Sequence, residues 1–560
     1  MKLVIVGMTL LLAGLISIAQ AAPMGGQISV GSGSINQSGP KTTITQQSQN
    51  LAINWQSFDI ATNEAVRFNQ PNTSSVALNR ILGSDPSRIL GSLSANGQIF
   101  ILNPNGVLFG NGAQVNVGGL VATDLSLNDA DFVAGKYKFS KGGGASSSIG
   151  IINQGTLTAA KGGYIALLAA RVSNQGIINA SRGTALLAAG DRITLTLNNG
   201  SLLGYSIDEG VISALVENHQ LIQADGGQVI LTAKAADQLT TAVVNNDGII
   251  EARTVENHNG TISLLSDIQS GQVNVTGVLD ASAPSGGDGG FIETSAAHVK
   301  IGDSAKITTV APRGKVGTWL IDPNDYTIGS GIGDDITGTA LSNNLNNTSV
   351  TILSSQGATA GNGDIFVNDP VTWSANTTLT LTAARNVIAN AVITATGNGA
   401  TLAINAGGTV SVAIGGGLGG IGGTNGAGLS GSGSLCISSG GGSSSCASNY
   451  NVNSSGAVSI NGGTINITGG ISGGGVITGG TITVTNTPLT FIASIGSIVG
   501  SAYTGVLQGV SALDKNHTGY SSAPSFGAAS LLSSGLPQYP NIDLVNGGVN
   551  VPDGSSINNL

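Results

Sequence analysis

The sequence has little charge, few aromatic residues and almost no cysteine. Charged residues make up 9% of its 560 residues and aromatic residues 4%, and there are two Cys. The formal net charge of -9 argues against nucleic-acid binding, which depends on clustered Lys and Arg, and against a polybasic membrane anchor. Beyond the N-terminus, apolar residues never form a run of about 20, so we expect no membrane-spanning segment in the mature chain.

Short apolar segments separated by Gly, Asn and Ser make up most of the chain. There are 87 Gly, yet 40% of the residues are hydrophobic, which is too apolar for a disordered chain. The length is too great for one compact core, so the chain has several domains or one elongated repeat. The alternation of apolar segments with turn residues is typical of β-strands and turns.

The N-terminus has the features of a secretory signal. Lys2 precedes an apolar run from Leu3 to Ile18, and Ala19-Gln20-Ala21 is a small-x-small cleavage site. The run is shorter than a membrane span, and no basic stop-transfer cluster follows it. We therefore predict a signal peptide over residues 1–21, Sec-dependent export to the periplasm, and a mature chain that begins near Ala22.

The two cysteines, Cys436 and Cys446, are separated by a spacer rich in Gly and Ser. In an exported protein such a spacer allows a small disulfide loop, and two free thiols are the alternative. A zinc site would need further Cys or His nearby, whereas the four His are scattered along the chain. The sequence therefore predicts no metal site and no cofactor.

A repeated unit predicts the fold. The segment Asn153–Ala159 returns as Asn174–Ala180, 21 residues later, and looser copies begin at residues 218, 246 and 275. A repeat of this length made of short strands indicates a solenoid. Gly and Asn suit its corners because they tolerate positive φ, and alternate apolar residues would point inward. Asn residues at equivalent corners would form a ladder of amide hydrogen bonds.

We therefore expect an all-β protein built as a right-handed parallel β-helix, with short extra-helical strands capping its N-terminal end. The predicted domains are a signal peptide over 1–21, a secretion domain over 22–140, β-helix repeats over 141–414, a Gly/Ser-rich loop with the cysteine pair over 415–447, further β-strand repeats over 448–502 and an irregular tail over 503–560.

An ordered set of motifs lies in the stretch from Gln27 to Leu127, and the first of them begins two residues earlier, at Gly25. The motifs are Gly25–Ile28, Ile53–Ile60, Val66–Pro71, Ala77–Ile81, Ile89–Phe100, Asn103–Gly110 and Val117–Thr123. This stretch resembles the secretion domain of filamentous haemagglutinins and related two-partner secretion exoproteins. Weaker likeness continues to Ala406. The resemblance implies export through an outer-membrane β-barrel transporter, and hence a secreted or surface location in a Gram-negative bacterium.

The resemblance also marks candidate residues of the secretion motif. They are Asn69, Gln70, Pro71, Asn79, Arg80, Asn103, Pro104, Asn105 and Gly106. The run Asn103-Pro104-Asn105-Gly106 has the composition of a tight turn, since Pro fixes the first turn position and Asn-Gly supplies positive φ. Two readings stay open: these residues build the start of the β-helix, or the transporter recognises them directly.

Sequence alone leaves the ligand open. We expect an adhesin that binds glycans or proteins of host or neighbouring cells and that is not an enzyme. The alternatives are a ligand scavenger of the haem-acquisition type and a β-helical enzyme acting on polysaccharides. Asp322 and Asp325, beside Trp319 and Tyr326, are the nearest approach to a catalytic carboxylate pair, but their composition favours a turn. The candidate binding insertion is the segment from Asp129 to Ser148, where the repeat breaks, or the cysteine loop from Cys436 to Cys446.

Overall fold

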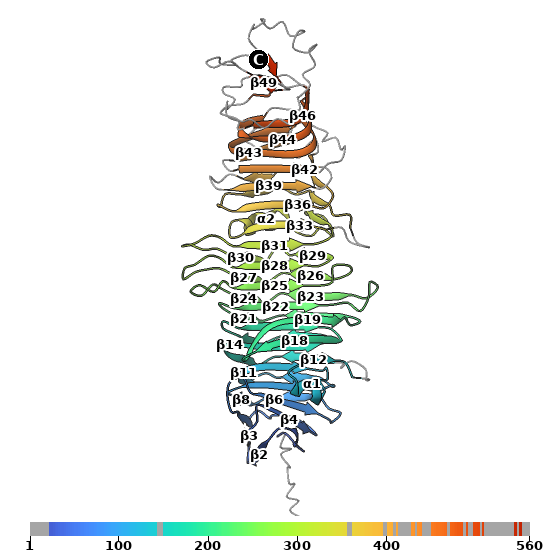
Figure 1. Cartoon of the computed structure of the whole chain (residues 1–560), viewed down its shortest axis with the longest axis vertical. Helices are drawn as coiled ribbons and strands as arrows, with labels where there is room; N and C mark the ends of the chain where they lie inside the picture. The colour runs from blue at the N-terminus through green and yellow to red at the C-terminus, as the bar shows by residue number, and fades with distance from the viewer. Residues whose placement is uncertain are drawn as a thin grey trace, which may run out of the picture.

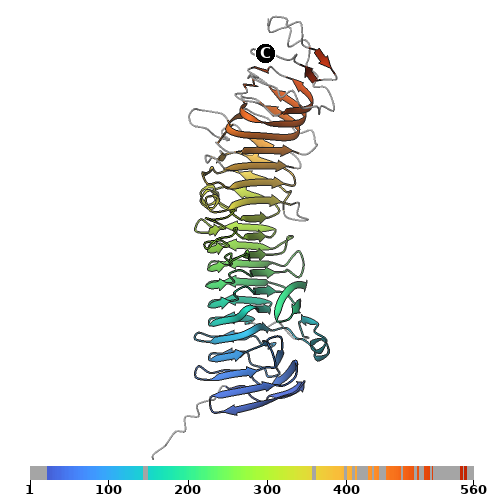
Figure 2. The ribbon, with the colours of Figure 1, turned by 60° about the vertical axis from the view of Figure 1, so that its left-hand side comes forward.

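The computed structural model describes residues 22–142, 149–355, 361–391, 393–395 and 400–406, and beyond residue 409 it gives only the bounds of strands. These residues form a long rod in which the chain winds from the N-terminal end, blue in Figure 1, toward the C-terminal end. Each turn of the chain adds a coil whose strands pair in parallel with those of the coils before and after it, as Figure 2 also shows. The predicted parallel β-helix is therefore confirmed.

Three faces make up each coil of the rod. Face 1 has the longest strands: β4 (Asn50–Trp55), β6 (Val76–Ile81), β9 (Gln98–Leu102), the second halves of β11 (Gln114–Thr123) and β14 (Thr156–Ala169), β17 (Thr184–Ala189), β22 (Gln228–Ala233), β25 (Thr261–Leu265), β28 (Phe291–Ser295), β31 (Thr318–Asp322), β33 (Ser349–Ser354), β36 (Thr378–Ala383) and β39 (Thr401–Ala406). Face 2 contains β7 (Ser87–Ile89), β10 (Val107–Phe109), β13 (Ile151–Asn153), β15 (Arg171–Asn174), β20 (Ala214–Asn218), β23 (Ala242–Asn246), β26 (Gln272–Val275) and β29 (His298–Ile301). Face 3 contains β3 (Lys41–Gln46), β5 (Ala65–Asn69), β8 (Ser92–Ala95), the first halves of β11 and β14, β16 (Ile177–Asn179), β21 (Leu221–Gln223), β24 (Ile249–Glu251), β27 (Val278–Asp280) and β30 (Lys306–Thr308).

Beyond these coils the pattern changes. The short strands there are β32 (Tyr326–Ile328), β34 (Ile365–Val367), β35 (Val371–Trp373), β37 (Val387–Ala389), β38 (Ile393–Ala395) and β40 (Val410–Val412). Helix α2 (Gly338–Leu345) lies between β32 and β33, and its Asn344 accepts a hydrogen bond from the backbone N–H of Ile307 over 2.8 Å. One coil therefore carries a helix next to β30 where the preceding coils carry strands.

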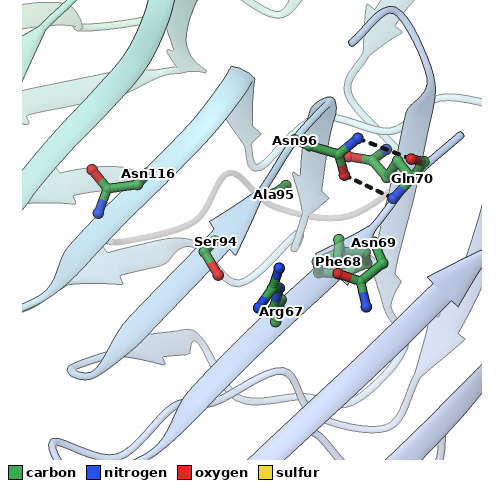
Figure 3. A pocket seen from close by; sticks show the side chains of 8 residues that line it. All are labelled: Arg67, Phe68, Asn69, Gln70, Ser94, Ala95, Asn96 and Asn116. Atoms are coloured by element: carbon green, nitrogen blue, oxygen red, sulfur yellow. Dashed lines mark hydrogen bonds between the residues drawn. The ribbon is translucent and has the colours of Figure 1, made fainter. Parts of the chain in front are cut away.

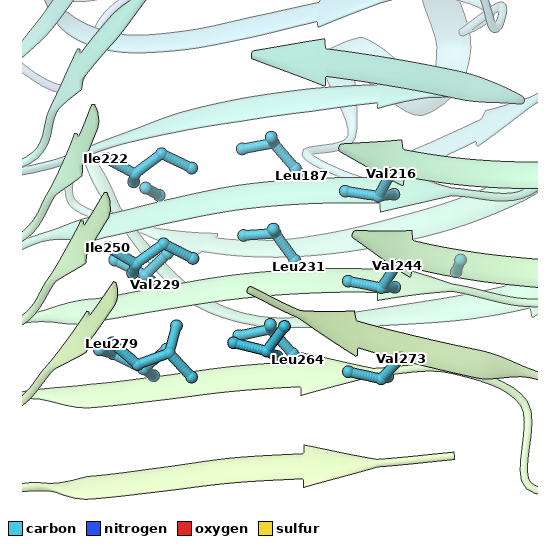
Figure 4. Packing of buried hydrophobic residues seen from close by; sticks show 14 of the residues in the cluster. Leu187, Val216, Ile222, Val229, Leu231, Val244, Ile250, Leu264, Val273 and Leu279 are labelled. Carbon is cyan, nitrogen blue, oxygen red and sulfur yellow. The ribbon is translucent and has the colours of Figure 1, made fainter. Parts of the chain in front are cut away.

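The core is a set of columns inside the rod. Leu187, Leu231 and Leu264 occupy equivalent positions on face 1 and are fully buried (Figure 4). Corresponding columns run along the other faces, as Val216, Val244 and Val273 and as Ile222, Ile250 and Leu279. Burial of each such side chain contributes about 1.5–3 kcal/mol, so the columns are the main source of stability.

The N-terminal end is capped by strands outside the coil pattern, as predicted. Strand β1 (Gln27–Val30) runs antiparallel to β4, and β2 (Gly33–Ser38) forms an antiparallel pair with β3. These strands occupy the blue end of the rod in Figure 1. The first coil is therefore covered by neighbouring backbone and does not end in an open sheet edge.

A second layer on the flank of the rod was not predicted. Strands β12 (Tyr137–Ser140), β18 (Arg192–Asn198) and β19 (Ser201–Glu209) form an antiparallel sheet. Together with helix α1 (Asp129–Val133) this sheet, here called the flank layer, covers outward-pointing apolar residues of face 1 such as Phe100 and Leu186. Figure 2 shows it beside the rod. The strands of face 1 beneath it are consequently buried on both sides.

The C-terminal part of the chain was predicted as a Gly/Ser-rich loop over 415–447, further β-strand repeats over 448–502 and an irregular tail over 503–560. Strands β41 (Ala427–Gly431) and β42 (Ser434–Ser439) lie within the range predicted as a Gly/Ser-rich loop. Further strands are β43 (Tyr450–Ile467), β44 (Ile471–Val484), β45 (Leu489–Thr490), β46 (Ser497–Thr504), β47 (Leu507–Gln508), β48 (Asp543–Val545) and β49 (Gly548–Asn550).

The signal peptide and the pairing of Cys436 with Cys446 lie outside the described residues and stay predictions, as do the domain boundaries. In the part of the chain that the structure describes, no helix is both long and apolar enough to cross a membrane.

Candidate functional site

The predicted tight turn is present between β9 and β10. The backbone N–H of Gly106 donates to the carbonyl of Asn103 over 2.9 Å, and Gly106 has a φ of 101°, which only glycine adopts at low cost. The N–H of Asn105 donates to Oδ1 of Asn103, also over 2.9 Å, so the Asn103 side chain closes the turn from within. Pro104 is exposed at its tip.

The turn is also bound to the preceding coil. The Asn103 amide, which is fully buried, donates to the carbonyl of Asp85 and to Oγ of Ser87, both over 3.0 Å. Asn105 donates to the carbonyl of Gly83 over 2.9 Å. Because both Asn side chains are used in these hydrogen bonds, they hold successive coils of the β-helix together. A building role for Asn103 therefore has direct geometric support.

Asn79 and Arg80 are adjacent on β6 but point to opposite sides of the strand. Asn79 is fully buried; its Oδ1 accepts from the indole N–H of Trp55 over 3.0 Å, and its amide donates to the carbonyl of Phe100 over 3.2 Å. Arg80 points outward and donates to the carbonyl of Leu127 over 2.8 Å and to Asp129 over 2.7 Å. Asn79 thus connects three coils, and Arg80 connects the rod to α1.

Gln70 lies at the centre of a buried amide network at the end of β5. Its amide donates to Oε1 of Gln46 over 3.0 Å and to the carbonyl of Gln98 over 3.3 Å, while its own Oε1 accepts from the N–H of Gly97 over 2.9 Å. The neighbouring backbone of Gln70 exchanges two hydrogen bonds with the side chain of Asn96. Gln70 is therefore a structural residue of the secretion motif.

A groove of about 490 Å³ opens on face 3 beside this network. Its lining residues are Arg67, Phe68, Asn69, Gln70, Ser94, Ala95, Asn96 and Asn116, from β5, β8 and β11 and the segments that follow β5 and β8 (Figure 3). Arg67, Ser94 and Asn116 occupy equivalent positions on three successive strands. A guanidinium beside amides and hydroxyls is suited to bind carboxylate or hydroxyl groups.

The structure thus separates the predicted motif residues into distinct places. Asn103, Pro104, Asn105 and Gly106 form one turn, and Asn69 and Gln70 lie in the groove with exposed Pro71 next to them. Asn79 and Arg80 lie on face 1. Three residues of the groove, Arg67, Ser94 and Asn116, were not predicted as site residues, because their proximity depends on a register that relates residues more than 20 positions apart. Only their outward positions in alternating strands could have indicated them.

The predicted insertion from Asp129 to Ser148 is described up to residue 142, where it forms α1 and β12 of the flank layer. Of the two carboxylates considered for catalysis, Asp325 holds a turn: its Oδ1 accepts from the backbone N–H groups of Asn362 and Asp364, both over 2.8 Å. Within the described ranges there is no group of three or more His, Cys, Asp or Glu that could hold a metal ion.

A rod of parallel coils, capped by antiparallel strands and carrying a flank layer, defines a β-helical protein. Comparison with known proteins then specifies the class. The family model of the TPS secretion domain, the two-partner secretion domain, matches residues 19–280. Residues 19–280 therefore carry a two-partner secretion domain, as the motifs predicted. The match extends well beyond residue 140, into the coils predicted as a separate repeat region.

Two curated relatives from Haemophilus influenzae are each named "Heme/hemopexin-binding protein". One, from strain Rd, is 34% identical over 255 residues, which are 44% of this chain and 28% of the relative. The other is 29% identical over 248 residues, 40% of this chain and 26% of the relative. The chain therefore matches only about a quarter of the length of these relatives.

Among solved structures, the chain is similar to the HMW1 secretion domain from Haemophilus influenzae. The sequence identity is 22% and the TM-score is 0.49, with 70% of this chain and 100% of that chain covered. The match to this domain supports the predicted export through a cognate outer-membrane transporter.

Proposed function

We propose that this exoprotein is an adhesin of the filamentous-haemagglutinin type, which acts outside the cell and binds glycans or proteins of host or neighbouring cells through the side of its rod. The observation that carries this proposal is the polar row on face 3, which passes through the groove. Arg67, Ser94 and Asn116 are continued in register by Thr158 and Asn179.

The row then runs on through Gln223, Glu251 and Asp280. Successive members are separated by one strand spacing of about 4.8 Å. Such a row offers hydrogen-bonding groups along the rod to an extended ligand. A polar ligand, such as a glycan with an acidic group, would place that group at Arg67 and its hydroxyls along the side chains from Ser94 to Gln223, short of the carboxylates of Glu251 and Asp280.

A binding measurement on the exported chain tests this proposal. Replacing Ser94 and Asn116 together by Ala should weaken binding to a panel of glycans and to host cells by about tenfold, equivalent to about 1.4 kcal/mol. Asn274→Ala, on the outward side of face 2, is the matched control and should leave binding unchanged. Equal binding by the wild type, the Ser94 and Asn116 double variant and Asn274→Ala would show that the polar row does not bind the ligand.

The second candidate is capture of haem or of a haem-carrying protein, which the names of the two relatives favour. In the residues that the structure describes, His219 contacts Asp247 over 2.7 Å, and Tyr164 and Tyr326 are buried. His219 and the two Tyr are therefore poorly placed as haem ligands, whereas His258 and His298 are exposed. Titration of the exported chain with haem, followed by absorption, distinguishes the two: a saturable spectral change would favour the scavenger, and its absence would favour the adhesin.

A further inference from the structure

An apolar row runs along the outside of face 3. Each of the strands β16, β21, β24 and β27 contributes one member, and these are direct neighbours in the register: Ile177, Leu221, Ile249 and Val278. The residue that follows each of them in its strand is fully buried, and Ile222, Ile250 and Leu279 form one of the core columns in Figure 4. Because side chains alternate along a strand, the row, here called the apolar stripe, points away from the core.

The apolar stripe is open to solvent. The exposed fraction is 37% for Ile177 and 43% for Ile249, and Leu221 and Val278 are half-buried. The outward positions of a sheet that has one solvated face are usually polar. The next positions in register beyond the two ends of the stripe follow this rule, as Thr156 and Lys306. A contiguous row of large aliphatic side chains on consecutive coils therefore indicates a contact surface.

Polar rows border the apolar stripe on both edges. The residues two positions before its members form the first row, which is exposed and consists of Gln175, His219, Asp247 and Thr276. The residues two positions after its members form the second row, which is part of the polar row described above and consists of Asn179, Gln223, Glu251 and Asp280. A ligand that covers the stripe therefore meets polar groups along both edges.

The two bordering rows are acidic. They contain the carboxylates of Asp247, Glu251 and Asp280, and neither row contains Lys or Arg. His219 contacts Asp247 over 2.7 Å. Arg253 lies beside the second row, but its guanidinium is shared between Asp225 at 2.6 Å and Glu251 at 3.1 Å. This charge favours a partner that carries basic side chains on both sides of an apolar row.

The spacing of the apolar stripe favours an α-helix as this partner. Successive members are about 4.8 Å apart, and the whole stripe is about 14 Å long. A helix lying along the rod presents one side chain per turn of about 5.4 Å, whereas a strand on the same line presents one every 6.6–6.8 Å or so. Over the length of the stripe the helix falls out of step by about 2 Å and the strand by about 5–6 Å. Two to three turns of helix would therefore cover the stripe.

We propose that the apolar stripe docks an amphipathic α-helix of a partner protein, whose apolar side covers Ile177 to Val278 and whose edges carry Lys or Arg. These basic side chains would pair with Asp247 on one edge and with Glu251 and Asp280 on the other. The aliphatic side chains offer no hydrogen-bonding group, so this part of face 3 suits a protein better than a glycan. The inference rests on the proposed function in one respect, the location of the partner outside the cell.

Peptide binding to the exported chain tests the proposal, with two synthetic amphipathic helices as probes. Both have Leu along one side, and one carries Lys and the other Glu on the remaining positions. We expect the Lys peptide to bind at least tenfold more tightly than the Glu peptide. Replacing Ile177 and Ile249 together by Thr, which also suits a strand, should weaken binding of the Lys peptide by about tenfold. Leu239→Thr, at a loop position that is 95% exposed, is the control and should bind like wild type.

A second variant keeps the test decisive if the double variant folds poorly. Asp280→Asn leaves the apolar stripe intact, and it should weaken binding of the Lys peptide about threefold and reduce the dependence of this binding on salt. Neutral phosphatidylcholine vesicles test a lipid as the alternative occupant. Equal affinity of the wild type for both peptides, an unchanged affinity in both the double variant and Asp280→Asn, or vesicle binding that requires Ile177 and Ile249 would show that the stripe docks no such helix.

Failure of this inference differs from failure of the adhesin proposal. If the Ser94 and Asn116 double variant loses glycan binding while the Ile177 and Ile249 double variant binds the Lys peptide like wild type, only the helix-docking surface is wrong. If neither glycans nor host cells bind the exported chain while the Lys peptide binds only through the apolar stripe, the adhesin proposal is wrong and the docking surface stands.

Discussion

Asn174 donates a hydrogen bond from its side-chain amide to Oδ1 of Asn218 over 2.8 Å, although 44 residues separate them in the chain. The same contact joins Asn153 to Asn174 over 2.8 Å and Asn218 to Asn246 over 2.7 Å. All four side chains are buried at the corner between faces 2 and 3. The ladder predicted from the repeat is therefore real, and it fixes the register of four coils.

Asn218→Ala should destabilise the rod by about 2 to 4 kcal/mol. The change removes two rungs of the ladder and leaves the amide of Asn174 and Oδ1 of Asn246 buried without these partners. The midpoint of urea unfolding measures the effect. Asn274→Ala removes an amide contact to Asn245 that is only partly buried, and it should shift the midpoint much less. Equal shifts would mean that the buried ladder adds no stability.

Asn103→Ala should destabilise the secretion domain by about 2 kcal/mol or more, because it removes the acceptor that closes the turn and the donor to Asp85 and Ser87. Pro104→Ser, at the exposed tip of the same turn, should leave thermal unfolding nearly unchanged. The pair separates the two readings of the motif: loss of export in Pro104→Ser with normal stability would indicate direct recognition by the transporter. Unchanged stability in Asn103→Ala would contradict the building role.

Stability should fall as pH rises from about 4 to 7, because of Asp124. Burial raises the pKa of this carboxyl to about 7, with a further contribution from the charge of Asp191. The folded state therefore holds a proton that the unfolded chain has released, so folding is disfavoured across this range and remains so above it. Since one pKa unit corresponds to about 1.4 kcal/mol, the effect amounts to a few kcal/mol.

Asp124→Asn is the matched variant, since it keeps the shape of the side chain and cannot ionise. We expect it to be more stable than wild type at pH 7.5 and to lose that part of the pH dependence. Urea unfolding at several pH values between 4 and 8 gives both quantities. Parallel stability curves for the two proteins would show that Asp124 ionises normally in the folded state.

The sequence was sufficient to predict the coils of the β-helix, because the repeat that forms them is local and regular. The Asn-Gln-Gly segment that joins β13 to β14 recurs between β15 and β16, so the stacking of these two coils could be inferred without a structure. The flank layer could not be inferred in this way. Strands β18 and β19 have the same alternation of apolar residues as the coils, and only the apolar outer side of face 1 determines that they pack outside the rod.

The sequence predicted which residues belong to the candidate site, but not how these residues are arranged in space. The motif residues could be identified because they resemble a family, but whether each is buried depends on the coils above and below it. Gln70 contacts Gln46 and Gln98, which lie 24 and 28 residues away, and no local pattern shows this network. Asp322 and Asp325 look alike in the sequence, and only the chain near Asn362 gives them different surroundings.

Export is the central claim, and it is tested most directly by measuring the full-length chain outside cells that either have or lack a cognate two-partner transporter. The account predicts the chain outside the cell only when the transporter is present, and a strong reduction for the variant with both Asn103→Ala and Asn105→Ala. Appearance of the chain outside cells that lack the transporter, or its retention in the periplasm in both cases, would contradict the account.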